Sequence, residues 1–226
     1  MNYKTVIKGK FISRPNRFIA YVEIDGKVEV CHVKNTGRCK EILIPGAKVY
    51  VEKSDNPNRK TMYDVIAVYK GEELINIDSQ APNKVFGEWA KQSGYFENIT
   101  LIKSECKYKN SRFDFYIEAN GRKIFVEVKG VTLEDNGVVK FPDAPTERGV
   151  KHINELIDCT KNGYEAYICF IIQMRNCKYF TPNRQTHPEF ADVLSKAENN
   201  GVNIIALCCD VKPCELIASD FVDVIL

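Results

Sequence analysis

The spacing of hydrophobic positions changes near residue 80. Up to Asp78, apolar and polar residues alternate in short runs that are separated by turn residues such as Asp25-Gly26 and Asn56-Pro57-Asn58. This period of two predicts β-strands. The expected strands are Tyr3–Ser13, Arg17–Ile24, Lys27–Val33, Lys48–Lys53 and Met62–Tyr69. Five short strands without a helix predict a small closed or nearly closed β-barrel, and we favour an OB-like barrel among the alternatives.

After residue 80 the pattern predicts helices that alternate with buried strands. Val85, Phe86, Trp89 and Ala90 have helical spacing, and Gly94 is well placed to end that helix. The later segments expected are a strand at Ile99–Glu105, a hairpin over 112–129, a helix from Thr146 to Gly163, a strand at Glu165–Gln173, a helix at Pro188–Asn199 and a strand at Asn203–Cys208. We therefore predict a mixed α/β chain of two domains: a nucleic-acid-binding barrel over residues 1–80 and an α/β domain over residues 81–226.

The hairpin between residues 112 and 129 has a register that the sequence alone specifies. Asn120-Gly121 lies between two strand-like runs, which is a strong signal for a two-residue turn. With that turn, Asp114 faces Glu127, and Lys129 shares their face because side chains alternate along a strand. The opposite face is uniformly apolar and is expected to face the core; it carries Phe113, Phe115, Ile117, Ile124, Val126 and Val128.

This register predicts a metal site. Two carboxylates directly opposite each other repel, since their Cβ atoms lie only about 4.5–5.5 Å apart, and a divalent cation between them removes the repulsion. Asp114, Glu127 and the backbone carbonyl of Val128 offer the oxygen ligands that Mg²⁺ or Mn²⁺ prefers. Lys129 is placed to orient a metal-bound water or to neutralise charge in a phosphoryl transition state. The alternative is a solvated Glu127–Lys129 ion pair with Asp114 merely nearby.

Asp114 followed by Glu127-x-Lys129 resembles the signature of PD-(D/E)xK nucleases, although Phe113 stands where that motif often has proline. Longer phrases resemble the sugar fermentation stimulation protein A family across nearly the whole chain. They are Arg14-Pro15-Asn16-Arg17-Phe18, Asn35-Thr36-Gly37-Arg38, Ser111–Phe115, Glu127–Leu133 and Phe141–Gly149. The resemblance implies an OB-like domain, a PD-(D/E)xK nuclease-like mixed sheet flanked by helices, and DNA binding.

Further residues are candidates for the site, each with a structural alternative. Glu88 on the first helix and Gln173 at the end of a buried strand are candidate catalytic residues, and each is otherwise an ordinary structural side chain. The candidates for nucleic-acid contacts are Arg14, Arg17, Arg38, Arg112, Arg148 and Lys151. Loop solvation and helix capping are the alternatives for these cations. His32 and His187 lack partners at useful spacing and are interpreted as structural.

Charge and cysteine content add little to the fold and the site predicted from the sequence pattern. Residues 1–79 carry 14 Lys and Arg against 10 Asp and Glu, whereas residues 80–226 carry 18 against 20, so the basic excess lies on the barrel. The nine cysteines are scattered without a Cys-x-x-Cys pair, which favours reduced thiols and no disulfide-linked partner. No apolar run is long enough for a membrane span, and the N-terminus has no apolar signal core, so we expect a cytoplasmic protein.

Three functional hypotheses follow. The first is a DNA-binding protein, for single or double strands, with a Mg²⁺- or Mn²⁺-dependent phosphodiesterase site. The second is a DNA-binding regulator of sugar metabolism with a nuclease-like fold and no turnover, as the family name implies. The third is a module that binds or processes RNA or single strands, because OB-like barrels accept both. The sequence does not specify the oligomeric state.

Overall fold

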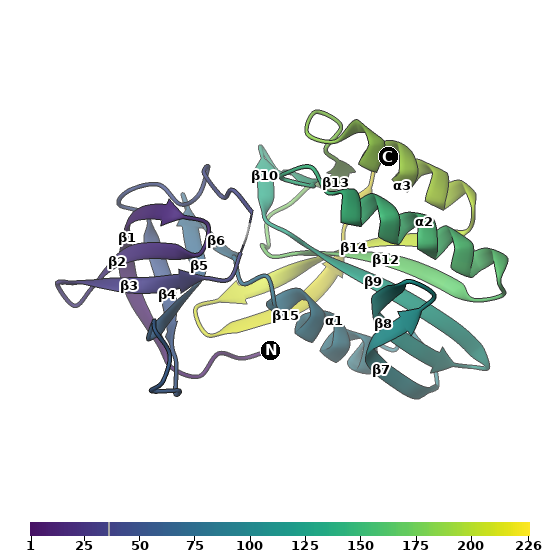
Figure 1. The fold of residues 1–226 in the computed structure, drawn as a ribbon, viewed down its shortest axis with the longest axis horizontal. Coiled ribbons are helices and arrows are strands. Elements are labelled where there is room, and N and C mark those ends of the chain that lie inside the picture. Colours follow the sequence, from purple (N-terminus) through teal and green to yellow (C-terminus); the bar gives the residue numbers. More distant parts are fainter. Residues whose placement is uncertain (36) are drawn as a thin grey trace.

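The computed structural model describes residues 1–35 and 37–226, so Thr36 of the Asn35–Arg38 phrase lies outside the described residues. The chain forms two lobes side by side, a barrel built from its first third and a larger lobe that contains the three helices found in the described residues (Figure 1). This is the mixed α/β architecture that the change in hydrophobic period predicted.

The first lobe is a five-stranded barrel of the OB type. Its strands are β1 (Val6–Asn16), β2 (Ile19–Ile24), β3 (Lys27–Val33), β4 (Lys48–Lys53) and β5 (Tyr63–Lys70), with β6 (Glu73–Asn76) added beside β5. The order around the barrel is β1, β2, β3, β5, β4, and it closes because β3 pairs in parallel with β5 and β4 pairs with β1. The alternating residues of each strand fill the interior, as buried Phe11, Val22 and Val49 illustrate.

The second lobe contains a six-stranded mixed sheet with helices on both faces. Its helices are α1 (Ala81–Gln92), α2 (Glu147–Lys161) and α3 (Pro188–Asn199). The sheet runs in the order β15 (Glu215–Phe221), β14 (Val202–Lys212), β12 (Glu165–Ile172), β9 (Arg122–Val131), β8 (Ser111–Ala119) and β7 (Ile99–Tyr108). β12 is parallel to both β9 and β14, whereas β8 is antiparallel to β9. α2 and α3 cover one face, and α1 packs on the other (Figure 1).

A small second sheet was not expected from the sequence. It has the order β10 (Leu133–Asp135), β11 (Val138–Phe141), β13 (Tyr179–Pro182) and β16 (Asp223–Val224). These strands of two to four residues, like β6, are too short to show a hydrophobic period. The edge strand β15 was also missed.

The hairpin has the predicted register where its strands pair. Asn120 and Gly121 both have positive φ, Ala119 pairs with Arg122, and Phe115 pairs with Val126. The prediction for Phe113 is wrong: it packs with Phe125 in the core beneath α2, not with Phe115 beneath α1. Both faces of this hairpin are covered by helices, so the face that carries Glu127 is also part of a core.

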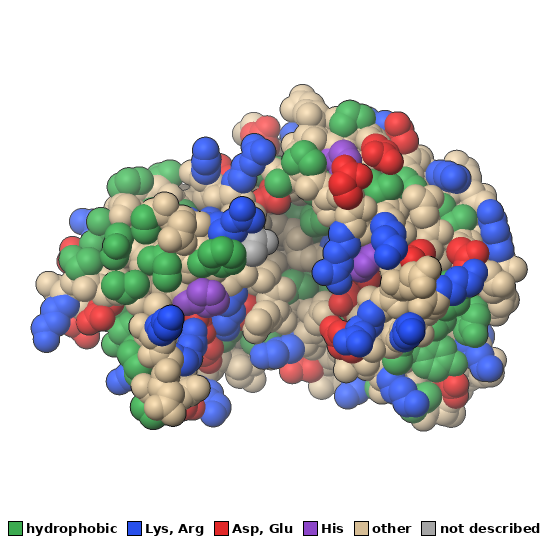
Figure 2. All heavy atoms as spheres, viewed as in Figure 1, with side chains coloured by type: hydrophobic (Ala, Val, Ile, Leu, Met, Phe, Trp, Pro, Cys, Tyr) green, Lys and Arg blue, Asp and Glu red, His purple; other side chains and the backbone are tan. Residues whose placement is uncertain are grey.

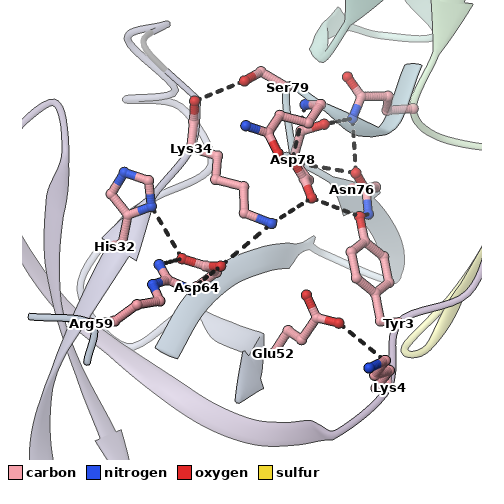
Figure 3. A network of polar contacts seen from close by, with 12 residues as sticks. Tyr3, Lys4, His32, Lys34, Glu52, Arg59, Asp64, Asn76, Asp78 and Ser79 are labelled. Atoms are coloured by element: carbon pink, nitrogen blue, oxygen red, sulfur yellow. Dashed lines mark hydrogen bonds and ion pairs between the residues drawn. The ribbon is translucent and has the colours of Figure 1, made fainter. Parts of the chain in front are cut away.

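A buried polar network lies where the barrel meets the second lobe (Figure 3). The Lys34 ammonium lies 3.4 Å from an Asp64 oxygen and 3.0 Å from an Asp78 oxygen. On the other side of Asp78, Gln173 donates its amide to Asn76 Oδ1 at 2.8 Å and to the Asp78 carbonyl at 3.1 Å. Because Gln173 follows β12 and Asn76 ends β6, these bonds fix the two lobes against each other.

In the part of the chain that the structure describes, no helix combines the length and the apolar character that crossing a membrane requires.

Candidate metal centre and nucleic-acid interface

Asp114 lies at the point where the β8–β9 ladder stops. The last paired residues are Phe115 and Val126, and Asp114 and Glu127 are the next residues on their strands. The Asp114 carboxylate accepts the backbone N–H of Val128 at 2.7 Å and the side-chain amide of Asn83 in α1 at 2.7 Å. A strand residue directs its N–H and its C=O to the same side, so the Val128 carbonyl points toward the β8 side as well.

Glu127 is buried with one oxygen satisfied and the other without a partner. Its Oε1 accepts the Lys129 ammonium at 2.6 Å and also contacts Nδ1 of His152 in α2. Its Oε2 is buried and has no hydrogen-bond partner among the described residues. Leaving a buried polar atom unpaired costs about 1–3 kcal/mol, and more when the group is charged. A cation next to Oε2 would remove this cost, so the donor set fits a hard divalent metal.

The environments of the two carboxylates shift their pKa values in opposite directions. Burial, followed by the nearby charge of Glu127, raises the pKa of Asp114. Burial alone would also raise the pKa of Glu127, but the hydrogen bonds from His152 and Lys129 and the charge of Lys129 outweigh it and lower that pKa. Glu127 is therefore held as a carboxylate, whereas Asp114 gains most from a neighbouring cation.

His152 and Asn83 are members of this site that the sequence reasoning did not identify. His152 is 4% exposed, and its Nε2 accepts Nε–H of Arg148 at 3.3 Å. A polar side chain next to Ile153 in the buried stripe of α2 was the available signal. Asn83 gave no such signal, because its role depends on how the first turn of α1 packs on the sheet.

Glu88 and Gln173 have other partners. Glu88 in α1 forms an ion pair with the Met1 amino group at 2.7 Å, and the described residues include no bond from it to Asp114 or Glu127. Gln173 is 1% exposed, and its amide contributes to the junction with the barrel. It lies beside the Glu-x-Lys strand, since a Cβ on Gly130 would come within 2.6 Å of Gln173 Oε1.

Arg14 is partly buried and holds a loop in place. Its guanidinium donates to the backbone carbonyls of Arg17, Asn35, Gly37 and Arg38 at 2.6–3.0 Å. These bonds leave it little capacity for a phosphate. The structural alternative for Arg14 is therefore the better description of its contacts.

The other predicted cations are exposed. Arg17 and Arg38, together with Lys40, line a cavity of about 610 Å³ whose lining also includes Arg14 and Ala144. On the second lobe, Arg112 makes a 3.4 Å ion pair with Glu105, and Lys151 reaches the Asn110 carbonyl at 3.4 Å. Arg148 is exposed beyond its bond to His152.

A recess separates the two lobes and leads to the end of the Glu-x-Lys strand. Figure 2 shows the molecule hollowed between the lobes, with Lys and Arg side chains on both sides of the hollow. A cavity of about 190 Å³ lies between them, lined by Asn35 and Ser79 on one side and by Gly130, Lys140 and Gln173 on the other. Gly130 directly follows Lys129, so the recess opens next to the candidate metal centre.

A second group of metal-ligating residues lies near the start of α2. Glu147, His187 and Glu189 bring potential ligand atoms within 4.8 Å of one another. However, His187 Nδ1 accepts the backbone N–H of Thr146 at 3.3 Å, so in the neutral ring the proton lies on Nε2, the atom that faces the two carboxylates. A protonated Nε2 cannot bind a metal, and both glutamates are exposed, so Asp114 and Glu127 are the stronger site.

Two family models cover most of the chain. The model described as SfsA N-terminal OB domain matches residues 12–77, and the one described as Sugar fermentation stimulation protein RE domain matches residues 80–215.

Curated relatives and a solved structure match along the full length. A sugar fermentation stimulation protein homolog of Clostridium beijerinckii is 62% identical over 226 residues and covers 100% of both chains. A second homolog, from Desulfitobacterium hafniense, is 60% identical over 224 residues, and the match covers 99% of this chain and 98% of the relative. The structure of Pyrococcus furiosus SfsA in complex with Ca²⁺ has a TM-score of 0.92 and 30% identity, covering 100% of this chain and 98% of that one.

Proposed function

The chain belongs to the sugar fermentation stimulation protein family, and from this premise we propose that it binds DNA and hydrolyses phosphodiesters with Mg²⁺ or Mn²⁺. The observation that carries the proposal is the unpartnered, buried Oε2 of Glu127 beside Asp114 and Lys129. Such an oxygen is costly in a protein without a ligand and useful in one that holds a cation.

The ligands of the proposed metal are Asp114, Glu127 and the carbonyl of Val128. All three offer oxygen, which suits Mg²⁺ and Mn²⁺ as well as Ca²⁺, the ion in the Pyrococcus furiosus SfsA structure. A bound ion would polarise a phosphate oxygen and lower the pKa of its water.

The side chains around the ligands have distinct roles in the proposal. Lys129, 17% exposed at its side chain, holds Glu127 and presents positive charge where a phosphate would gain negative charge. Arg148 and Lys151, exposed near the start of α2, would contact phosphates on either side of the cleaved bond. Arg17 and Arg38 on the barrel would hold the strand further away, so that DNA lies across the recess between the lobes.

Nuclease assays with site variants test this proposal. The purified chain is incubated with linear, supercoiled and structured DNA plus Mg²⁺ or Mn²⁺, and we expect cleavage that is lost in Glu127→Ala and Lys129→Ala. Glu134→Gln is a matched control, since Glu134 is also a largely buried glutamate paired with a lysine, Lys70, at 2.5 Å. Cleavage that survives Glu127→Ala would identify a contaminating nuclease and refute the assignment.

The non-catalytic regulator differs from this proposal in its response to metal. If metal occupies the site and helps to hold DNA, the affinity for DNA rises on titration with Mn²⁺ and this rise disappears in Asp114→Asn. A regulator with an idle site binds DNA equally well with or without metal, and equally well in the variant.

Single-strand binding is a second candidate, because the barrel exposes an apolar face. On β2 and β3 the outward side chains of Tyr21, Val30 and Val28 are 37%, 45% and 63% exposed, and Tyr21 pairs with Val30 across the strands. Phe18 nearby is 50% exposed, and the Arg17 guanidinium lies 5.8 Å from its ring centre. Figure 2 shows hydrophobic side chains gathered on this lobe. Exposed rings next to cations suit stacking with unpaired bases.

Competition among single-stranded DNA, duplex DNA and RNA at fixed salt tests this candidate. Replacing Phe18 or Tyr21 by alanine should cost about 1–3 kcal/mol of single-strand affinity each, the usual value for a stacked base. Phe221→Ala is the matched control, because Phe221 is 56% exposed but lies on β15. Equal losses for Phe18→Ala and Phe221→Ala would exclude the barrel face as a specific platform.

A further inference from the structure

The two oxygens of the Glu127 carboxylate have unequal surroundings. Oε1 receives both Lys129 and His152, whereas Oε2 is buried without a partner among the described residues. We propose that His152 is a positioning residue that fixes Glu127 with Oε2 as its metal-binding oxygen, and that Arg148 keeps the imidazole in the tautomer that does so. This inference rests on the proposed metal site and adds two residues to its support.

The hydrogen bonds around His152 define its tautomer. Arg148 is always a donor, and its Nε lies 3.3 Å from His152 Nε2, so Nε2 must accept. The ring proton is then on Nδ1, the nitrogen that faces Glu127 Oε1. With the opposite tautomer, Nδ1 and Oε1 would be two acceptors in contact, and Nε2–H would face the Arg148 donor.

Lys129 alone would not select one oxygen of Glu127. The last torsion of a glutamate is broad and nearly two-fold, and a lysine ammonium on a flexible stem follows either oxygen. His152 cannot follow in this way: it is 4% exposed, sits one helical turn after Arg148, and packs its ring against Phe113 at 6.2 Å between centres. The rigid donor therefore comes from α2, and the flexible one from β9.

This arrangement predicts that metal affinity depends on a donor at the position of Nδ1. Groups that hydrogen-bond to metal-binding side chains typically change metal affinity by about 10–100-fold when removed. His152→Phe keeps the ring that packs on Phe113 but removes the donor. His152→Asn places an amide N–H close to the position of Nδ1, so it should restore the hydrogen bond.

The test is Mn²⁺ affinity of the full chain without DNA, measured by calorimetry and by the EPR signal of free Mn²⁺. We expect His152→Phe to weaken binding by about 10–100-fold and His152→Asn to recover most of the loss. His187→Phe, at a buried histidine in the cap of α3, should bind Mn²⁺ like the wild type. Wild-type affinity in His152→Phe, or an equal loss in His152→Asn, would overturn the positioning role.

Two further measurements keep this inference separate from the metal site itself. If Glu127→Gln does not weaken Mn²⁺ binding, the proposed metal site is wrong; if it does and His152→Phe does not, only the role of His152 is wrong. Long-range ¹H–¹⁵N NMR on the wild type reads the tautomer without any variant. A proton on Nδ1 supports the inference, whereas an Nε2–H tautomer or a doubly protonated ring would refute it.

Discussion

Replacing Lys34 by methionine should destabilise the protein strongly, although Lys34 is in neither the metal centre nor the barrel core. Lys34 is 15% exposed at its side chain and lies between Asp64 and Asp78, which are 6% and 2% exposed (Figure 3). Methionine keeps most of the volume of the stem but removes the cation. Breaking a buried pair in this way leaves an uncompensated charge and typically costs about 3–5 kcal/mol.

The partners that remain place the expected loss at the lower end of that range. Asp64 keeps Arg59, whose two terminal nitrogens lie 2.9 and 2.5 Å from its oxygens. Among the described residues, Asp78 keeps only neutral donors, which include the Tyr3 hydroxyl at 3.4 Å and the backbone N–H of Gln80 at 2.9 Å. One carboxylate is thus left without a cation. A loss of about 3 kcal/mol corresponds to a fall in Tm of about 6–12 °C for a chain of this size.

Thermal unfolding at pH 7 measures this, with Lys4→Met as the control. Lys4 also pairs with an aspartate, Asp55, at 2.9 Å, but both side chains are exposed, so its loss should change Tm little. Adding Asp78→Asn to Lys34→Met removes the unpaired charge and should recover part of the stability. A Tm for Lys34→Met no lower than that of Lys4→Met would refute the idea that this network stabilises the junction.

The difference between wild type and Lys34→Met should also depend on pH. Burial alone would raise the pKa of Asp64, but the Arg59 hydrogen bonds and the charges of Lys34 and Arg59 outweigh it and lower the pKa. A carboxyl group whose pKa is lower in the folded protein stabilises the fold at any pH above its pKa in the unfolded chain, which is about 3.9. This stability is lost as the pH falls through the pKa of the folded protein. The two proteins should therefore differ most near neutral pH and converge in acid below about pH 4. A constant difference down to pH 3 would contradict this.

Three other variants test separate parts of the molecule. Without metal, Asp114→Asn should have a higher Tm than the wild type at pH 7, because burial and Glu127 raise the pKa of Asp114 and make its ionised form costly. The variant should also lose the rise in Tm that Mn²⁺ gives the wild type. A metal-free Tm below that of the wild type would contradict this. Gln173→Leu removes buried hydrogen bonds to the barrel and should cost about 1–3 kcal/mol in urea unfolding, and an unchanged midpoint would show that these bonds do not hold the lobes. Thr146→Ala removes the hydrogen bond from the Thr146 side chain to the first turn of α2 and should lower the free energy of unfolding by about 1 kcal/mol in the same assay. An unchanged free energy of unfolding would show that water replaces this cap fully.

The local structure of the candidate site was predictable from the sequence. Asn120-Gly121 needs positive φ at both positions, and few other residue pairs adopt this conformation easily, so the turn and the register of Phe115 with Val126 follow from neighbouring residues. The predicted pairing of Asp114 with Glu127 lies one residue beyond the last pair of that ladder, where the alternation of faces is not kept: Asp114 bonds to Asn83 in α1, whereas Glu127 contacts His152 in α2. The barrel and the buried strand β12 follow from the same kind of local pattern.

Other features depended on contacts between segments far apart in the chain. The face on which Phe113 packs was predicted wrongly, because the alternation of faces is interrupted between Phe113, in the core beneath α2, and Phe115, in the core beneath α1. This interruption and the second core beneath α2 depend on tertiary packing. His152 lies 25 residues from Glu127, and Gln173 lies 97 residues from Asn76, so no spacing rule connects them.

Residues and their spacing therefore determined which groups this protein brings to the end of β9: two carboxylates and a lysine in one short hairpin. Only the tertiary structure decided how those groups are held. Packing α2 against the sheet buries Glu127 and gives one of its oxygens a rigid donor in His152. It leaves the other oxygen without a partner among the described residues. The physical reason is that burial and hydrogen-bond partners are properties of the assembled core, whereas strand register is a property of the local chain.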